Sequence, residues 1–222
     1  MAVQERHLLI CGPEPAADWR CLHALLASAA VVGLCRPEEE AMLRAALRPG
    51  WCHQGGRAER LCHGDTRPLL STGAKAAVVV GSGGSRGQRR WCLLPLDHLL
   101  RAARALVGWP AEMCGPGHKV LPLALAGLAN PLPLHHVSGL MPALRSQALG
   151  IPHRFLSRRQ WRDRTQRPSL RGWGLVLVPS QLQWLMGEPG GVDWLRQLSC
   201  CWVGGAPLAP ALRQRARCSR LN

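Results

Sequence analysis

Apolar runs broken by glycine and proline mark the predicted strands and helices in the first half of the chain. The run 76–80 is continuously apolar and leads into a glycine-rich turn, Gly81–Gly87, as a buried parallel strand does before a phosphate-binding turn. The positions after it predict a return strand over 91–94 and a helix over 96–106. Earlier, the pattern predicts a helix that runs into a short strand over 23–34, and another helix that begins at Pro37.

Strands and helices alternate more regularly in the second half. The apolar segment 121–129 predicts a strand that ends in a histidine-bearing loop, before a helix over 140–149 that Gly150 ends. The remaining predicted segments are, in order, a short strand over 151–156, a solvated arginine-rich connection over 157–171, a strand over 174–178, a helix from Pro179, a short helix over 192–198, a strand over 199–203 and a last helix over 210–217.

This alternation of strands and helices predicts an α/β fold with parallel-sheet layers and flanking helices. Residues 1–70 are expected to be a weakly defined helix and strand region of the same domain as the core region, 71–222. In such sheets ligands bind at the carboxyl ends of the strands. The glycine-rich turn, the histidine-bearing loop and a second glycine turn, which follows the predicted strand 199–203, all fall at such ends.

Composition changes this picture in one respect, because the chain is strongly basic. Its formal net charge is +15, and two of its 28 basic residues are lysines, which leaves 28 − 2 = 26 arginines. Nucleic acid is therefore a candidate partner. We rank it third, since the arginines are scattered apart from a cluster over 158–167 and are not interleaved with aromatic residues along one element. We expect no nucleic-acid partner, and the cluster is interpreted as solvated surface.

The cysteines, histidines and apolar runs predict a cytoplasmic protein without a resident metal. Ten cysteines are spread without regular spacing and no signal peptide precedes them, which is typical of a reducing compartment. The pairs Cys52–His53 and Cys62–His63 do not have the ligand spacing of zinc sites, so a plain loop is favoured there. Proline, glycine and asparagine interrupt the longest apolar runs, and no membrane segment is predicted. Oligomeric state is left open.

The glycine-rich turn by itself leaves two interpretations open. It lacks the Gly-Lys-Ser/Thr ending of a Walker P-loop, and Arg86 stands where a Gly-x-Gly-x-x-Gly pattern from Gly81 needs its third glycine. The turn is either a flexible connection or a phosphate site with hydroxyl and arginine side chains around it.

Four segments in one order resemble the adenylate-forming acyl-CoA synthetases. The turn 81–89 resembles the phosphate loop of that family, and 133–140 (PLHHVSGL) resembles its Pro-Leu-x-His-x-x-Gly segment. The segment 178–182 (VPSQL) is similar to its Val-Pro-Thr-x-Leu, and 203–208 (VGGAPL) to its Gly-Gly-Ala-Pro-Leu. Within the family, the sequences of segments 134–146 and 194–205 look most like those of the 2-succinylbenzoate-CoA ligases of menaquinone and phylloquinone synthesis.

The resemblance implies an ATP-dependent acid–CoA ligase, which adenylates a small carboxylic acid and then forms a thioester with coenzyme A. Charge on the phosphates would be neutralised by protein groups and Mg²⁺. His136 would lie at the junction of acyl group and adenylate. The other implied site residues are, for ATP, Ser82, Gly83, Gly84, Ser85, Gly87, Arg89, Gly204, Gly205 and Ala206 and, for the acid, His135, Ser138, Gly139 and Arg145.

Departures from the family pattern keep an alternative open. Gly84 replaces a hydroxyl residue, Arg86 a glycine, and Arg89 a lysine. The family's later motifs, among them a magnesium-binding glutamate and a C-terminal lid lysine, are not in this sequence. We therefore expect an N-terminal portion of such an enzyme, which alone should form no acyl-CoA. The alternative is a non-catalytic remnant, or a nucleotide- or acid-binding module. Three residues also have structural alternatives to a role in binding. His135 and His136 could be hydrogen-bonded histidines at the end of a strand, and Arg145 could lie on a solvated helix face. Cys200 and Cys201 are expected in the core.

Overall fold

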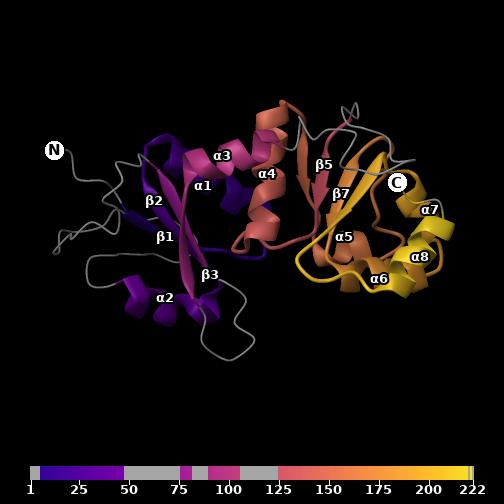
Figure 1. Cartoon of the computed structure of the whole chain (residues 1–222). Coiled ribbons are helices and arrows are strands. Elements are labelled where there is room, and N and C mark those ends of the chain that lie inside the picture. The colour runs from indigo at the N-terminus through magenta and orange to yellow at the C-terminus, as the bar shows by residue number, and fades with distance from the viewer. Residues whose placement is uncertain (1–5, 48–75, 82–89, 106–124, 220, 222) are drawn as a thin grey trace. The chain divides into compact units, whose positions relative to one another are not determined.

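The computed structural model describes residues 6–47, 76–81, 90–105, 125–219 and 221 (Figure 1). It divides the chain into two compact units, each of which is described by itself. The first comprises residues 1–101 and 133–140, and the second comprises residues 102–132 and 141–222. Both contain a sheet with helices packed on it, so the predicted α/β class is confirmed.

The sheet of the first unit has four strands in the order β1-β2-β3-β4. Strands β1 (Arg6–Ile10), β2 (Val31–Cys35) and β3 (Ala77–Gly81) run parallel, and β4 (Trp91–Pro95) returns antiparallel to β3. Every residue of β2 and β3 is buried, which explains why both read as unbroken apolar runs. The predicted buried strand and its return strand are therefore confirmed.

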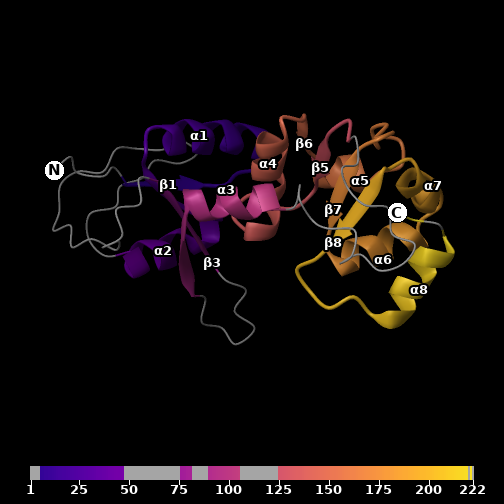
Figure 2. The same ribbon diagram turned by 45° about the horizontal axis from the view of Figure 1, so that its top comes forward.

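Helices cover both faces of this first sheet. Helix α1 (Pro15–Ala27) and helix α2 (Glu40–Leu47, after the 3-10 turn Pro37–Glu39) lie on opposite sides of it in Figures 1 and 2. Leu43 of α2 packs with Leu8 and Ile10 of β1 in one buried cluster. Helix α3 (Leu96–Ala105) follows β4 as predicted, whereas α1 begins at Pro15, earlier than the predicted start at residue 23.

The sheet of the second unit is parallel throughout, with strand order β6-β5-β7-β8. Its strands are β5 (Leu128–Asn130), β6 (His153–Phe155), β7 (Gly174–Leu177) and β8 (Cys200–Val203). Because all four run the same way, their carboxyl ends share one edge of the sheet. Cys200 is 7% exposed and belongs to the core, as predicted, and burial raises the pKa of its thiol to about 12.

Four helices cover one face of this second sheet. They are α5 (Arg158–Arg162), α6 (Pro179–Gly187), α7 (Gly191–Arg196) and α8 (Pro210–Cys218). Trp161, Leu185, Trp194 and Leu212, one from each helix, pack in the same buried cluster as Leu175 and Leu177 of β7. In the described part of the chain, no helix is both long and apolar enough to cross a bilayer.

The arginine-rich segment 157–171 corrects one prediction, because it is not simply a solvated connection. Ser157 caps helix α5: its Oγ accepts a hydrogen bond from the Gln160 N–H at 3.2 Å, and Gln160 Oε1 accepts one from the Ser157 N–H at 2.9 Å. Trp161 and Leu170 are buried. The helix was not predicted because most of its residues are charged or polar, and only Trp161 packs into the core.

Candidate functional site

The predicted phosphate loop follows β3 directly. Gly81, predicted as the first residue of the turn, is instead the last residue of β3 and pairs with Trp91 of β4. The six predicted site residues after it, Ser82, Gly83, Gly84, Ser85, Gly87 and Arg89, lie outside the described residues, as do Cys52–His53 and Cys62–His63. The structure therefore fixes the strand from which the loop departs.

The histidine-bearing segment begins at a buried asparagine that the sequence analysis did not single out. Asn130 ends β5, is fully buried, and accepts a hydrogen bond through Oδ1 from the Leu132 N–H at 2.9 Å. This is a local side-chain turn of the kind that ends a strand. The signal available in the sequence was the pair Asn130–Pro131 after an apolar run, which marks such a turn.

Helix α4 (Val137–Leu149) starts immediately after the two histidines. Its first turn is set by the His136 carbonyl oxygen, which accepts hydrogen bonds from the N–H groups of Gly139 and Leu140, each at 2.9 Å. The predicted start at residue 140 was thus three residues late, and Ser138 and Gly139 lie in the first helical turn instead of the loop. Gly150, with φ +66°, ends the helix as predicted.

The two histidine rings lie against each other. Their centroids are 4.4 Å apart with the ring planes tilted by 51°, and the His135 side chain is buried while His136 is half-buried. His135, His136, Ser138 and Gly139 all belong to the first unit. The two histidines precede α4, and Ser138 and Gly139 lie in its first turn.

Arg145 lies on α4 in the second unit and is half-buried, so the interpretation as a solvated helix face is wrong. Burial lowers the pKa of its guanidinium. Its Nε is shielded from solvent and has no hydrogen-bond acceptor in the described part of the chain. A desolvated donor without an acceptor is unfavourable, and an anion placed beside it would relieve that cost.

His153, which the sequence analysis did not single out, ties β6 to α4. Its Nδ1 lies 3.1 Å from the Oγ of Ser146, and that hydroxyl donates to the carbonyl oxygen of Pro142 at 3.1 Å. Burial lowers the pKa of His153 to about 4, so the ring is neutral near neutral pH. No sequence signal pointed to this pair, because a histidine in a three-residue strand carries no pattern.

The second glycine turn lies at the carboxyl end of β8. The Gly204 N–H donates to the Leu177 carbonyl oxygen at 3.0 Å, and Gly205 adopts φ +82°. A Cβ at Gly205 would lie 3.3 Å from Cγ1 of Val178, so this turn packs on the start of α6. Gly204, Gly205 and Ala206 are exposed. Two of the segments that resemble the ligase family, 178–182 and 203–208, therefore meet at one edge of the second sheet.

The described residues were compared with the ligand groups that hold metal ions in proteins. Within the ranges 6–47, 76–81, 90–105 and 125–219, no group of three or more His, Cys, Asp or Glu side chains could hold a metal ion.

Comparison with known proteins gives a clear result at the level of fold. No protein-family model matches the chain and no curated protein matches its sequence. The O-succinylbenzoate coenzyme A synthetase of Bacillus subtilis, in complex with AMP, matches with a TM-score of 0.65 and 14% identity, over 99% of this chain and 60% of that one. Its complex with ATP and a magnesium ion matches with a TM-score of 0.64 and 13% identity, over 97% and 47% of the two chains.

A malonyl-CoA ligase with methylmalonyl-CoA and AMP bound matches with a TM-score of 0.60 and 17% identity, over 96% of this chain and 49% of that one. The chain has the fold of the N-terminal part of an adenylate-forming enzyme. It spans 60% of the length of the first of these solved chains and about half of the other two. At these identities the similarity establishes the fold and leaves the reaction to be argued from the residues.

Proposed function

We propose that the chain is part of an ATP-dependent acid–CoA ligase. One observation carries the proposal: on the fold of an adenylate-forming enzyme, the three motif-bearing turns come after β3, β5 and β8, at strand carboxyl ends. In the proposed reaction a carboxylate oxygen attacks the α-phosphorus of ATP and pyrophosphate leaves. The coenzyme A thiol, losing its proton, then attacks the acyl carbon and AMP leaves. Neither step needs a nucleophilic side chain.

The proposed ATP site lies mainly on the loop after β3. Backbone N–H groups of Gly83, Gly84 and Gly87 and the hydroxyls of Ser82 and Ser85 would donate to the phosphates. Arg89 would supply the cation that balances their charge. ATP would enter as its magnesium complex, and Gly204, Gly205 and Ala206 would form a wall beside the nucleotide and the acyl group.

The proposed acid site follows the turn between β5 and α4. His136 would lie at the junction of acyl group and adenylate, with His135, Ser138 and Gly139 on the acid side. The half-buried guanidinium of Arg145, whose Nε has no acceptor in the described chain, favours a substrate with a second carboxylate. We therefore propose an aromatic dicarboxylic acid such as 2-succinylbenzoate, in which one carboxylate reacts and the other binds Arg145.

Acid-dependent exchange of labelled pyrophosphate into ATP tests the adenylation step with the full chain. Exchange that requires 2-succinylbenzoate and magnesium would support the adenylation step, whereas acyl-CoA formation by this chain alone is not expected. In Arg145→Gln the acid concentration for half-maximal exchange should rise roughly tenfold to a hundredfold, the loss expected for a charge-assisted contact. The matched control is Arg154→Gln, at an exposed arginine of β6, which should behave as the parent chain does. Equal effects in both variants would contradict the role of Arg145.

A second candidate is a module that binds nucleotide or acid without turnover. The observation in its favour is the altered phosphate loop, with Gly84, Arg86 and Arg89 at positions where the family has a hydroxyl, a glycine and a lysine. Calorimetric titration with ATP separates the two. A second titration uses 2-succinylbenzoate. Saturable binding of either ligand without acid-dependent exchange would establish the module, and the absence of binding of both would overturn both candidates.

A further inference from the structure

Positive charge is concentrated in residues 157–219 of the second unit. This stretch holds ten arginines against three carboxylates, Asp163, Glu188 and Asp193, and contains no lysine or histidine, so its formal charge is 10 − 3 = +7. Among these described residues the one ion pair is Arg196 with Asp193, at 3.0 Å. Most of this charge is therefore not neutralised within the chain.

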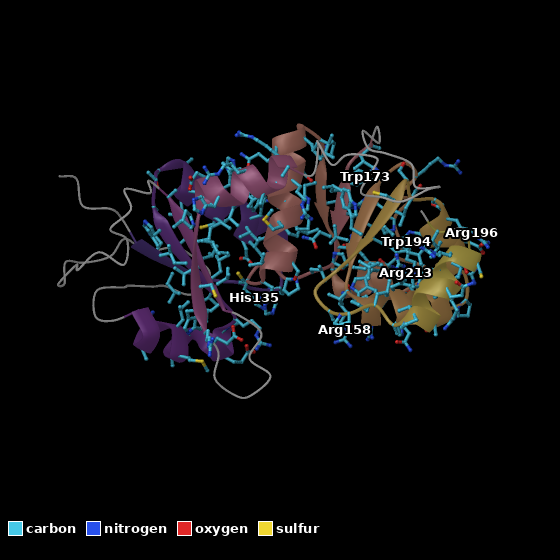
Figure 3. All side chains as sticks on the ribbon, viewed as in Figure 1. His135, Arg158, Trp173, Trp194, Arg196 and Arg213 are labelled. Carbon is cyan, nitrogen blue, oxygen red and sulfur yellow. The ribbon has the colours of Figure 1, made fainter. Side chains whose placement is uncertain are left out.

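The arginines gather on the helical face described above. Helices α5, α6, α7 and α8 with their connections, here called the arginine layer, turn their apolar residues toward β7. On α8, Leu212 is buried and Ala216 packs on the core, which leaves the arginines of this helix on the outside. The exposed arginines of the layer are Arg158, Arg159, Arg164, Arg171, Arg196, Arg213, Arg215 and Arg217, and Figure 3 labels three of them, Arg158, Arg196 and Arg213.

Two further arginines lie against tryptophan rings beneath this surface. The Arg162 guanidinium carbon is 5.3 Å and 5.0 Å from the ring centroids of Trp161 and Trp184, and that of Arg167 is 5.8 Å and 5.7 Å from those of Trp184 and Trp194. A tryptophan face attracts a cation but does not neutralise its charge. Arg162 Nε and both Nη atoms of Arg167 have no hydrogen-bond acceptor within the described chain.

This arrangement removes the reason for ranking nucleic acid last. Basic and aromatic residues are not interleaved along one element of the sequence, but they are interleaved in space, because Trp161, Trp184 and Trp194 come from three helices. The scattered arginines likewise converge on one layer. A linear pattern could not show either fact, since an arginine and the tryptophan it contacts lie up to 194 − 167 = 27 positions apart.

We propose that the arginine layer binds the phosphate backbone of nucleic acid, without sequence preference. The guanidinium fork matches phosphate oxygens in pairs, and a surface rich in unpaired arginines attracts a polyanion from a distance. An anionic membrane fits less well, because helices at a bilayer surface need an exposed apolar face. The exposed large apolar residues of the described chain are Met42 and Val137, and neither is in the layer.

The test is a fluorescence anisotropy titration of a labelled oligothymidylate with the full chain. We expect a dissociation constant in the range of about 1 to 100 μM near physiological salt, and a steep loss of affinity between about 50 and 200 mM salt. The triple variant Arg158→Gln, Arg213→Gln, Arg217→Gln removes three exposed arginines of the layer. Its affinity at low salt should fall roughly tenfold or more, and the slope of log K against log salt should decrease in magnitude by about 2, at about 0.7 for each phosphate contact.

The matched control removes the same charge elsewhere. Arg20→Gln, Arg90→Gln, Arg104→Gln changes three exposed arginines outside the layer and should alter affinity less than about twofold. Unchanged circular dichroism in both triple variants shows that the fold is retained. Equal losses in the two variants, affinity independent of salt, or binding to phosphatidylserine vesicles without binding to the oligonucleotide would each overturn the proposal. None of these outcomes bears on ATP or pyrophosphate exchange, so a failure here leaves the proposed ligase function to its own test.

Discussion

The two units use arginine in different ways. In the first, Arg36, Arg44 and Arg101 each lie within reach of a carboxylate three or four positions away on the same turn or helix, at 2.6, 2.8 and 3.3 Å. In the second, Arg196 also pairs with Asp193 at 3.0 Å, but Arg162 and Arg167 lie on tryptophan rings, and Arg167 Nε donates to the Trp161 carbonyl oxygen at 3.1 Å. Local ion pairs neutralise charge, whereas aromatic faces hold the cation and leave its charge to act outward.

The stability of the two units should therefore depend on different interactions, and this can be tested for each unit. In the first unit the two central strands, β2 and β3, are wholly apolar, and Arg36, Arg44 and Arg101 pair with carboxylates at its surface. The second unit contains a half-buried histidine whose pKa is lowered, arginines over tryptophans and a tight helix–helix corner. Its stability should therefore respond to changes that leave the first unit untouched.

The largest effect should come from Gly191→Ala, at the corner between α6 and α7. A Cβ at this position would overlap the carbonyl oxygen of Leu185, a backbone atom that cannot rotate away. We expect a loss of about 2–4 kcal/mol of unfolding free energy, typical of forced overpacking. Differential scanning calorimetry should show that only the transition of the second unit moves to lower temperature.

The control for that variant is Gly187→Ala, four positions earlier, where a Cβ would meet nothing within 4 Å. It lies at the last residue of α6 and should be neutral or stabilise by up to about 1 kcal/mol. A single cooperative transition that shifts as a whole in Gly191→Ala would break the comparison, because it would show that the two units do not unfold separately.

The sequence allowed the elements around this corner to be predicted well. Strand β7, helix α6, helix α7, strand β8 and helix α8 are marked by apolar runs with Pro179, Gly187, Gly191 and Pro210 between them, and all were predicted to within a few residues. Proline and glycine act locally through backbone geometry, so a linear pattern contains their effect. The antiparallel return of β4 was predictable for the same reason.

What could not be predicted depends on partners far away in the chain. Arg162 and Arg167 read as solvated because their charge is visible in the sequence, while the rings of Trp184 and Trp194 that receive them are not adjacent to them. The start of α4 was missed because Ser138 and Gly139 favour loops. The hydrogen bonds that the Gly139 and Leu140 N–H groups donate to the His136 carbonyl oxygen are made by the backbone, so residue types do not reveal them. Half-burial of Arg145 and the His153–Ser146 contact likewise come from packing between segments.

The second largest effect should be a pH dependence of opposite sign in the two units. His153 has its pKa lowered to about 4, so it takes up a proton more readily when unfolded. Stability of the second unit is then complete above about pH 6.5 and is lost as the pH falls from about 6.5 toward 4, on the order of 2–3 kcal/mol in all. In the first unit, burial raises the pKa of Asp18, against the effect of the Gly12 N–H that donates to it at 2.9 Å.

Asp18 therefore binds its proton more readily when folded, and its contribution is present below about pH 3.8 and lost as the pH rises through its raised pKa. Acidification from pH 7 to 5 should lower the transition temperature of the second unit first. His153→Gln should flatten that dependence, while His98→Gln, at an exposed histidine of α3, should leave it intact. Identical profiles for the parent chain and His153→Gln would show that this histidine is not the group responsible.

A moderate effect should separate the two kinds of arginine directly. Arg167→Ala removes two cation–π contacts and a hydrogen bond, and we expect a loss of about 1–2 kcal/mol that persists at high salt. Arg101→Ala removes an exposed ion pair with Asp97 and should lose a few tenths of a kcal/mol, which salt screens further. Urea denaturation at low and high salt measures both. Similar losses with the same salt dependence would mean that the two units do not differ in this respect.

The smallest effect should distinguish two neighbouring glycines at the carboxyl edge of the second sheet. Gly205 has φ +82°, and a Cβ there would press on Val178 at 3.3 Å, so Gly205→Ala should lose about 1–2 kcal/mol. At Gly204 a Cβ would meet nothing within 4 Å, and Gly204→Ala should be nearly neutral in stability. Thermal unfolding compares the two variants, and equal stability would indicate that the turn relaxes freely. If Gly204→Ala nevertheless weakens ATP binding, the open space beside Gly204 is needed by a ligand and not by the fold.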